Sequence, residues 1–355
     1  MHKSIDTKDG EAMLMTAIDD AAHRSLTEAG PLALRRRSLA LLLAPLLAPG
    51  VARAQAYPSR PIRIVVPWPP GGVTDLAGRI VAQQLSELLS TAVVVDNRAG
   101  AAGTIGAQAA SRAAPDGYTL LLASAETHAI APNLRDTLPY DPLKDFVAVA
   151  PFAINPFSLV ARGDFPASTT RELVAAVASA PGKFSYSSAG LGSASQIAME
   201  TFKGLAKLDI LHVPFPGQAP AVTSLTSGQT DLQMLPAGSA AALREGGKVK
   251  VFAVTTRARF FGMPEIPSLR EEGFESMDFA NWFGLVAPAG VPAEVPRRLA
   301  AEMAAVVRSA EAQAALRRIG LEVYPPTPPD DFQRFIEAEL PRWGGVIRNA
   351  NIRPG

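Results

Sequence analysis

The stretch at residues 67–75 reads Pro-Trp-Pro-Pro-Gly-Gly-Val-Thr-Asp and decides the fold. It follows the apolar run Ile-Arg-Ile-Val-Val at residues 62–66 and precedes a helical pattern, so it predicts a turn from a strand into a helix. Gly71 and Gly72 let the backbone come close to a ligand, and the start of the helix presents unpaired N–H groups with a partial positive charge. The stretch is therefore either an anion-binding turn or an ordinary connection.

Three apolar runs around this turn predict a parallel sheet. Residues 62–66, 93–95 and 118–122 read as strands, with a helical pattern between consecutive runs. Their spacing of roughly thirty residues is typical of βαβ units with right-handed crossovers. The loops at 96–104 and 123–128 then reach the same carboxyl edge of the sheet as the turn, which is where open α/β sheets bind ligands.

The helix after the turn has an apolar pattern that predicts which side faces the sheet. We expect either Thr74 or Asp75 at its N-cap, and Asp75 is interpreted as a residue that caps the helix or orients bound water rather than as a general base. The expected buried positions are Leu76, Ile80, Val81, Leu85 and Leu88.

Composition favours two domains and excludes several classes of partner. The chain has 355 residues, more than one core usually holds. Its 34 basic and 33 acidic residues nearly cancel, and no basic block alternates with aromatic residues, which argues against nucleic-acid binding. The absence of cysteine excludes disulfides, thiolate metal sites and a cysteine nucleophile.

The N-terminal region predicts export. Arg35, Arg36 and Arg37 precede an apolar run at residues 39–48 and an Ala-Arg-Ala sequence at 52–54, a pattern typical of a secretory signal peptide. The run is shorter than the ~20 residues that span a bilayer. The arginines are compatible with the general secretory route and with the twin-arginine route. We therefore treat residues 1–54 as a signal peptide with an N-terminal extension.

A second α/β unit is predicted after residue 155. Residues 157–161 and 282–287 are interpreted as the two crossings between lobes, and residues 183–187, 210–215, 231–235 and 249–255 as strands between them. Lobe 1 is then discontinuous, 57–155 plus 279–355, and lobe 2 is 156–278. A helix with Leu299, Met303 and Val306, a strand at 321–324 and a helix at 332–340 are expected to pack on lobe 1.

The second lobe has its own glycine-rich turn at residues 187–195, Ser-Ser-Ala-Gly-Leu-Gly-Ser-Ala-Ser. It leads into a helix whose apolar positions include Ile197, Phe202 and Leu205. Hydroxyl and backbone N–H groups there suit a second anionic or polar end of a ligand, although such loops also serve as connectors. Two donor-rich turns, one on each lobe, favour a carboxylate held in the cleft.

Known enzyme motifs are missing from the sequence. The glycines at 100, 103 and 106 do not have the spacing of a dinucleotide-binding fingerprint, and the 67–75 turn lacks the lysine of a P-loop. His128 and His212 are the histidines after residue 54, and neither lies in a metal-spaced cluster or beside a nucleophile. His212 is interpreted as a packed residue, and His128 as packed or facing the cleft. We predict no enzyme, no cofactor and no metal.

The chain resembles a known family through a series of short stretches. These are residues 64–75, residues 93–106 with Val-Val-Asp-Asn-Arg-Ala-Gly, and residues 114–121, which read Ala-Pro-Asp-Gly-Tyr-Thr-Leu-Leu. The similarity continues through residues 138–146, 182–192, 228–232, 282–290 and 342–344. They are similar to the tripartite tricarboxylate transporter solute-binding receptors, the Bug-type periplasmic receptors, and the resemblance spans residues 57–352. It implies a two-lobed type II periplasmic binding protein fold of the α/β class, a Venus flytrap that closes on a small carboxylate.

The resemblance and the two turns together give the candidate ligand-binding residues. These are Trp68, Pro70, Gly71, Gly72, Thr74, Asp75, Thr127, His128, Ser188, Gly190, Gly192, Ser193, Ala194 and Gln233. Gln233 is interpreted either as a ligand donor or as a surface residue at a strand end. Phe215 and Pro216 stand where the family usually has tyrosine and lysine, so a hydroxyl and a cation are absent there.

The predicted function is a periplasmic receptor, monomeric, that captures a small organic carboxylate and delivers it to a tripartite tricarboxylate-type membrane permease. One alternative is a ligand-presenting adaptor for a membrane sensor. The other is an α/β enzyme acting on a carboxylated metabolite. The missing catalytic motifs favour the receptor over the enzyme. Only the identity of the membrane partner would distinguish the receptor from the adaptor.

Export gives the first testable prediction. Expressed with its own N-terminus in a Gram-negative host, the protein should reach the periplasm after cleavage following Ala54 or Ala56, since both sites end an Ala-x-Ala sequence. The intact mass of periplasmic protein measures the cut. A cytoplasmic chain that keeps residues 35–54 would contradict the prediction.

Overall fold

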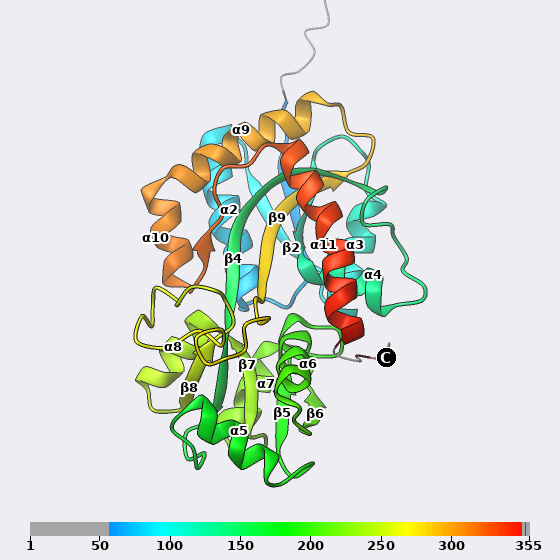
Figure 1. The fold of residues 1–355 in the computed structure, drawn as a ribbon. Coiled ribbons are helices and arrows are strands. Elements are labelled where there is room, and N and C mark those ends of the chain that lie inside the picture. The colour runs from blue at the N-terminus through cyan, green and yellow to red at the C-terminus, as the bar shows by residue number, and fades with distance from the viewer. Residues whose placement is uncertain (1–56, 350–351, 353–355) are drawn as a thin grey trace, which may run out of the picture. The chain divides into compact units, whose positions relative to one another are not determined.

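The structure is a computed structural model that describes residues 57–349 and 352. These described residues form one compact unit, which holds all the helices and strands considered below (Figure 1). The predicted signal peptide and its cleavage sites lie outside the described residues. Across residues 57–349, we find no helix with the length and apolar character that a membrane crossing needs.

One long strand, β4 (Phe146–Arg162), connects two sheets. Its first part, up to Pro156, pairs antiparallel with β9 (Ala280–Pro288), and its last six residues pair with β7 (Leu232–Pro236) and β8 (Val249–Val254). Irregularities in register accompany Pro151, because proline has no N–H to donate to the ladder. The strand thus passes from one lobe to the other without a break.

The first sheet is built from the predicted parallel strands. β1 (Ile62–Val66) pairs in parallel with β2 (Val93–Asn97) and with β3 (Thr119–Ser124), which confirms the parallel arrangement. β9 enters between β3 and β4, antiparallel to both. The two-residue strand β10 (Glu322–Val323) pairs with β4.

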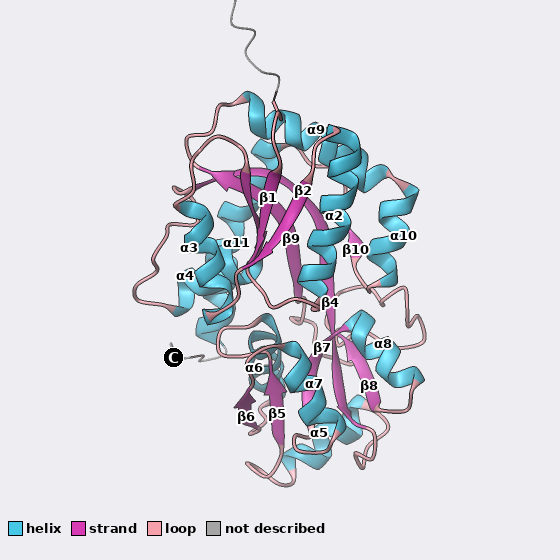
Figure 2. Ribbon diagram, turned by 180° about the vertical axis from the view of Figure 1, so that it is seen from behind, coloured by secondary structure: helices cyan, strands magenta, loops and turns pink. Residues whose placement is uncertain are grey.

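Helices cover both faces of this first sheet (Figures 1 and 2). One face packs on α2 (Val73–Leu89), α9 (Glu294–Arg308) and α10 (Ala310–Arg318). The other packs on α3 (Thr104–Ser111), the π-helical turn η3 (Glu126–Ile130), α4 (Ala131–Leu134) and α11 (Pro329–Asn349). Leu299, Met303 and Val306 are buried, as predicted, and the chain after β9 completes the first lobe.

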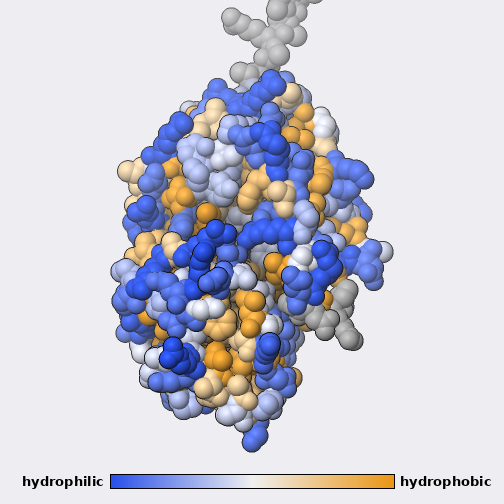
Figure 3. Space-filling view, viewed as in Figure 1, coloured by the Kyte–Doolittle hydropathy of each residue, from blue (hydrophilic) through white to orange (hydrophobic). Residues whose placement is uncertain are grey.

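The second sheet contains β5 (Ser185–Ser188), parallel to β6 (Leu211–Pro214) and β7. Its helices are α5 (Thr170–Ala178), α6 (Ala194–Ala206), α7 (Gln218–Thr226) and α8 (Ala237–Glu245). All four predicted strands of this region are present, with bounds shifted by at most two residues. On the face seen in Figure 3, hydrophobic side chains gather on the lower part, over this second sheet and its helices.

The predicted buried face of α2 is partly wrong. Leu76 and Leu88 are 39% and 43% exposed, whereas Ala77, Val81 and Leu85 are fully buried. The cause is close packing on the sheet: a Cβ added at Gly78 would lie 2.9 Å from Val66 Cγ2. Small residues form the contact, so the large apolar residues beside them are displaced toward solvent. Leu205 of α6 is likewise 40% exposed, contrary to expectation.

A substitution at Gly106 tests how closely α3 packs against the turn after β1. A Cβ at Gly106 would lie 2.8 Å from the Arg98 carbonyl oxygen and 2.8 Å from Pro67 Cα, both backbone atoms that cannot rotate away. Overpacking of this kind costs about 1–3 kcal/mol, which exceeds the gain of up to ~1 kcal/mol from alanine in a helix. Gly106→Ala should therefore lower the free energy of unfolding, measured by urea titration.

Gly345 of α11 provides the matched control, because nothing lies within 4 Å of a Cβ added there. Gly345→Ala should be neutral or stabilising by up to ~1 kcal/mol. Equal effects of the two substitutions would contradict the close approach of α3 to the turn.

Candidate functional site

The turn at residues 67–75 lies between β1 and α2, at the carboxyl edge of the first sheet. The N-cap of α2 is Gly72, not Thr74 or Asp75, and it makes no side-chain cap. Gly71 is the residue that needs glycine, with φ +85°, whereas Gly72 has an ordinary φ of −80°. The predicted cap was wrong because the helix begins one residue before Thr74, at Val73.

Hydrogen bonds to the Asp75 carboxylate hold this turn in place. Its carboxylate accepts hydrogen bonds from Gly71 N at 2.9 Å, Arg79 Nε at 3.0 Å and Asn97 Nδ2 at 2.9 Å. Asn97 Nδ2 also donates to the Trp68 carbonyl at 3.1 Å, so β2 and α2 both fix the turn. Burial alone would raise the pKa of Asp75, but the bonds from Arg79, Gly71 and Asn97 together hold it below its usual value.

The second glycine-rich loop satisfies most of its own polar groups. Ser193 is the N-cap of α6 and its hydroxyl accepts from Gln196 N, while the Ser195 hydroxyl accepts from Ala189 N. Ser188 Oγ lies 2.7 Å from Nε2 of His212. The serine hydroxyls therefore make hydrogen bonds that hold the loop's own conformation, and they are only partly free to bind a ligand.

A cavity of about 720 Å³ lies between these two loops and the starts of α7 and α8. Its lining includes residues from the first turns of four helices, α2, α6, α7 and α8, and α2 and α6 follow the loops just described. The first N–H groups of a helix have no partner within the helix and carry a partial positive charge. Much of the remaining lining is apolar, for example Leu76, Phe157 and Val222.

Three lining residues have a buried polar atom without a hydrogen-bond partner: Trp68 Nε1, Gln218 Nε2 and Asn155 Oδ1. Leaving a buried donor or acceptor unpaired costs about 1–3 kcal/mol. Trp68 belongs to the first turn and Gln218 is the first residue of α7, so the two unpaired donors come from the two lobes. A ligand with acceptor atoms would satisfy both.

Two charged groups belong to the lining. Glu126, after β3, is 7% exposed, and its carboxylate accepts from Ser124 Oγ at 2.8 Å, Asn281 Nδ2 at 2.6 Å and Ala194 N at 3.3 Å. Burial raises its pKa, and those hydrogen bonds oppose the rise. Arg318, at the end of α10, is exposed and is the one basic residue among the described residues of the lining.

The sequence-predicted residues divide into those in the cavity wall and those outside it. Trp68, Pro70, Gly71, Gly72, Thr74 and Ser193 line the cavity. Asp75 and Ala194 stand behind the wall and support it. Residues not in the lining are Thr127, His128, Ser188, Gly190, Gly192 and Gln233.

Packing explains why several of the predicted residues do not line the cavity. Thr127 and His128 are fully buried, and the His128 ring packs against Phe146 and Trp282 at centroid distances of 5.1 and 6.2 Å. Gln233 is fully buried in the middle of β7 with both amide atoms unpaired, so it is not at the surface. His212 stacks on Tyr186 at 4.6 Å, in agreement with its interpretation as a packed residue.

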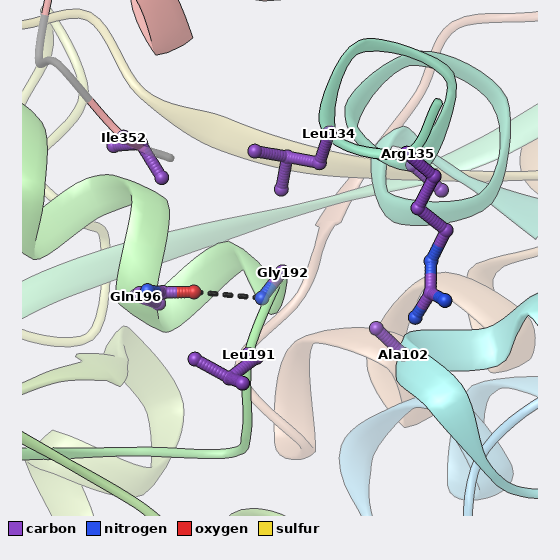
Figure 4. Close-up of a pocket in the computed structure, with 8 residues that line it drawn as sticks. Ala102, Leu134, Arg135, Leu191, Gly192, Gln196 and Ile352 are labelled. Atoms are coloured by element: carbon purple, nitrogen blue, oxygen red, sulfur yellow. Dashed lines mark hydrogen bonds between the residues drawn. The ribbon is translucent and has the colours of Figure 1, made fainter. Parts of the chain in front are cut away.

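Gly192 instead lines a second, smaller cavity of about 100 Å³ (Figure 4). There its N–H donates to Gln196 Oε1 at 2.7 Å, and Leu134 and Arg135 of the first lobe lie on the opposite wall. This cavity has room for several water molecules.

Sequence reasoning missed several lining residues: Glu126, Asn155, Ser195, Gln218, Ser239, Asn281 and Arg318. Gln218 could have been predicted from the sequence, because it begins a helix that follows a strand, as α2 follows β1 through the 67–75 turn. Pro216, where the resemblance led us to expect lysine, also lines the cavity, so this position contributes no cation to it.

Comparison with known proteins places the chain in a family. A family model described as the tripartite tricarboxylate transporter family receptor matches residues 77–352. BugT of Bordetella pertussis is 33% identical over 309 residues, which cover 84% of this chain and 92% of BugT.

Two solved structures from Rhodopseudomonas palustris cover nearly the same region. Rpa4515 with adipate has a TM-score of 0.81 and 33% identity, over 84% of this chain and 100% of that chain. MatC with bound malate has a TM-score of 0.77 and 31% identity, over 82% and 100%. These similarities confirm the predicted α/β, two-lobed periplasmic binding protein fold.

The buried His128 gives a prediction for the dependence of stability on pH. Burial lowers its pKa to about 3, against about 6.5 for an exposed histidine. Between these values the unfolded chain binds a proton at this residue that the folded chain does not, so stability falls as the pH falls below 6.5. The contribution of one residue is at most about 1.4 kcal/mol per pH unit.

His128→Gln removes this titration, so its destabilisation relative to wild type should be smaller by about 2 kcal/mol at pH 5 than at pH 7. Urea unfolding of both proteins at the two pH values measures the difference. His212 titrates in both and cancels. A destabilisation independent of pH would contradict a His128 that stays neutral in the folded protein.

Proposed function

Because the chain belongs to the tripartite tricarboxylate transporter receptor family, we propose that it captures a small organic carboxylate in the periplasm and delivers it to a membrane permease of that transporter type. The ligand is held in the cavity between the two lobes. The residues proposed to contact it are those of the predicted set that line this cavity, together with Gln218, Asn155 and Ser195.

One observation carries the proposal: two helix starts and two unpaired side-chain donors face the same space from opposite lobes. α2 begins at Val73 and α7 at Gln218, and both ends line the cavity. Trp68 Nε1 and Gln218 Nε2 are buried there without acceptors. A carboxylate supplies two acceptor oxygens and a negative charge, which match both the donors and the helix dipoles.

We propose that the lobes divide as 57–155 plus 279–355 against 156–278, and that they close by bending β4 near Asn155 and Pro156. At this point β4 leaves β9 and begins to pair with β7 and β8. Bending of a short segment between two rigid sheets is typical of hinge closure around a ligand. A single chain holds both walls of the cavity, so the receptor is proposed to act as a monomer.

A ligand-presenting adaptor for a membrane sensor uses the same cavity and differs only in its partner. The α/β enzyme has weaker support, because the matched family members are receptors and the cavity wall shows no nucleophile with a base among the described residues. Periplasmic localisation, with cleavage of residues 1–54, is part of the proposal.

Binding is tested first by thermal unfolding of the mature protein with mono-, di- and tricarboxylates. A ligand that binds only the folded state stabilises it by about 2.7 kcal/mol at a concentration one hundred times its Kd. Calorimetry then gives the affinity of the best compound. Failure of every carboxylate to raise the melting temperature would overturn the proposal.

Trp68→Phe removes one of the two unpaired donors. It should weaken carboxylate binding about tenfold to hundredfold, the equivalent of a hydrogen bond to a charged group. The ligand-free protein should lose no hydrogen bond, because Trp68 Nε1 has no partner, so its stability should fall less than in a substitution that breaks such a bond.

Trp343→Phe is the matched control, since Trp343 Nε1 donates to the buried Glu339 at 2.7 Å, in α11. It should lower stability and leave affinity unchanged. Unchanged affinity in Trp68→Phe would remove this residue from the proposed site.

A further inference from the structure

The start of α6 already holds a carboxylate that belongs to the protein. Ala194, the first residue of α6 in the second lobe, donates its N–H to Glu126 Oε1, and Glu126 follows β3 in the first lobe. The other carboxylate oxygen accepts from Ser124 Oγ and Asn281 Nδ2. The positive end of this helix is therefore neutralised from within the chain.

The orientation of these groups is fixed. Asn281 Oδ1 accepts from Ala125 N at 3.0 Å, so its Nδ2 must point to Glu126. The Ala194 N–H is also a donor and nothing else. Glu126 thus acts as an acceptor in the cavity wall, and it has no donor to offer to a second carboxylate.

Asn155 extends this acceptor-rich end. It is 3% exposed, lines the cavity, and stands opposite Asn281 in the pairing of β4 with β9. Its Oδ1 is buried without a donor. An unpaired acceptor on the strand next to Asn281, which itself binds the Glu126 carboxylate, favours a hydroxyl or ammonium group and disfavours another anion.

The end formed by α2 and α7 has the opposite character. Trp68 Nε1 and Gln218 Nε2 are unpaired donors there, and a Cβ added at Gly217 would lie 3.9 Å from Pro69 Cγ, so the two helix starts face each other closely. Asp75, whose carboxylate accepts from Gly71 N in the same turn, is already paired with Arg79 at 3.0 Å.

We propose that Glu126 makes the cavity selective for ligands with a single carboxylate, which binds at the α2 and α7 starts, and with a hydrogen-bond donor at the other end, which meets Asn155 and Glu126. The apolar lining between the two ends holds the body of the ligand. This inference rests on the proposed function and adds the class of ligand to it.

Two length-matched series of compounds test the preference. One contains adipate, hexanoate and the ω-hydroxy and ω-amino acids of the same chain length, and the other contains succinate, butyrate and their ω-substituted counterparts. In at least one series the wild type should bind the ω-hydroxy or ω-amino acid at least about tenfold more tightly than the dicarboxylate. A dicarboxylate that binds as tightly or more tightly in both would overturn the inference.

Glu126→Gln should reduce this preference at least about tenfold, mainly through tighter binding of the dicarboxylate, because the repelling charge is gone. Glu126→Ala is the second variant: it leaves the Ala194 and Asn281 donors free and should favour the dicarboxylate further. Circular dichroism melting verifies that each variant is folded. Preferences equal to wild type in a folded variant would overturn the role of Glu126.

Glu337→Gln, on the exposed side of α11, is the control for loss of one negative charge and should leave the preference unchanged. The two proposals fail differently. Binding of dicarboxylates in preference to the ω-substituted acids overturns the selectivity alone, whereas no binding of any carboxylate overturns the proposed function and the selectivity with it.

Discussion

The hydrogen bonding of β4 is the constraint on which the two lobes depend. Its side chains are almost all buried, so its backbone N–H and C=O groups need partners within the protein. β9 and β10 supply them in the first lobe, and β7 and β8 in the second. In the closure proposed above, β4 bends where its partners change, around Pro156, which has no N–H to lose.

The cavity follows from this arrangement. Each lobe has parallel strands whose carboxyl edges face the other lobe, so the helices after those strands begin beside one common space. Four helix starts would make a uniformly positive wall. Glu126 breaks that uniformity at α6, and as a result the two ends of the cavity differ in the sign of the group that they attract.

Much of the fold could be predicted from the sequence, because strand spacing and apolar runs are local signals. The packing of α2 could not, since apolarity selects Leu76 and Leu88 whereas the close contact is made through Ala77 and Gly78. Some of the predicted site residues in turns with a local signature, such as Gly71 and Ser193, line the cavity. Glu126 was missed because its three donors come together only in the folded chain.

The place of β9 in the first sheet sets an order of assembly. Every strand of the second sheet lies within residues 146–254, so that sheet is complete in the chain before β9 begins at Ala280. The first sheet, in contrast, keeps a gap between β3 and β4 until Ala280–Pro288 arrives, more than one hundred residues later. Closing such a distant contact is slow. In a chain that emerges from its N-terminus, the lobe begun first is therefore finished last.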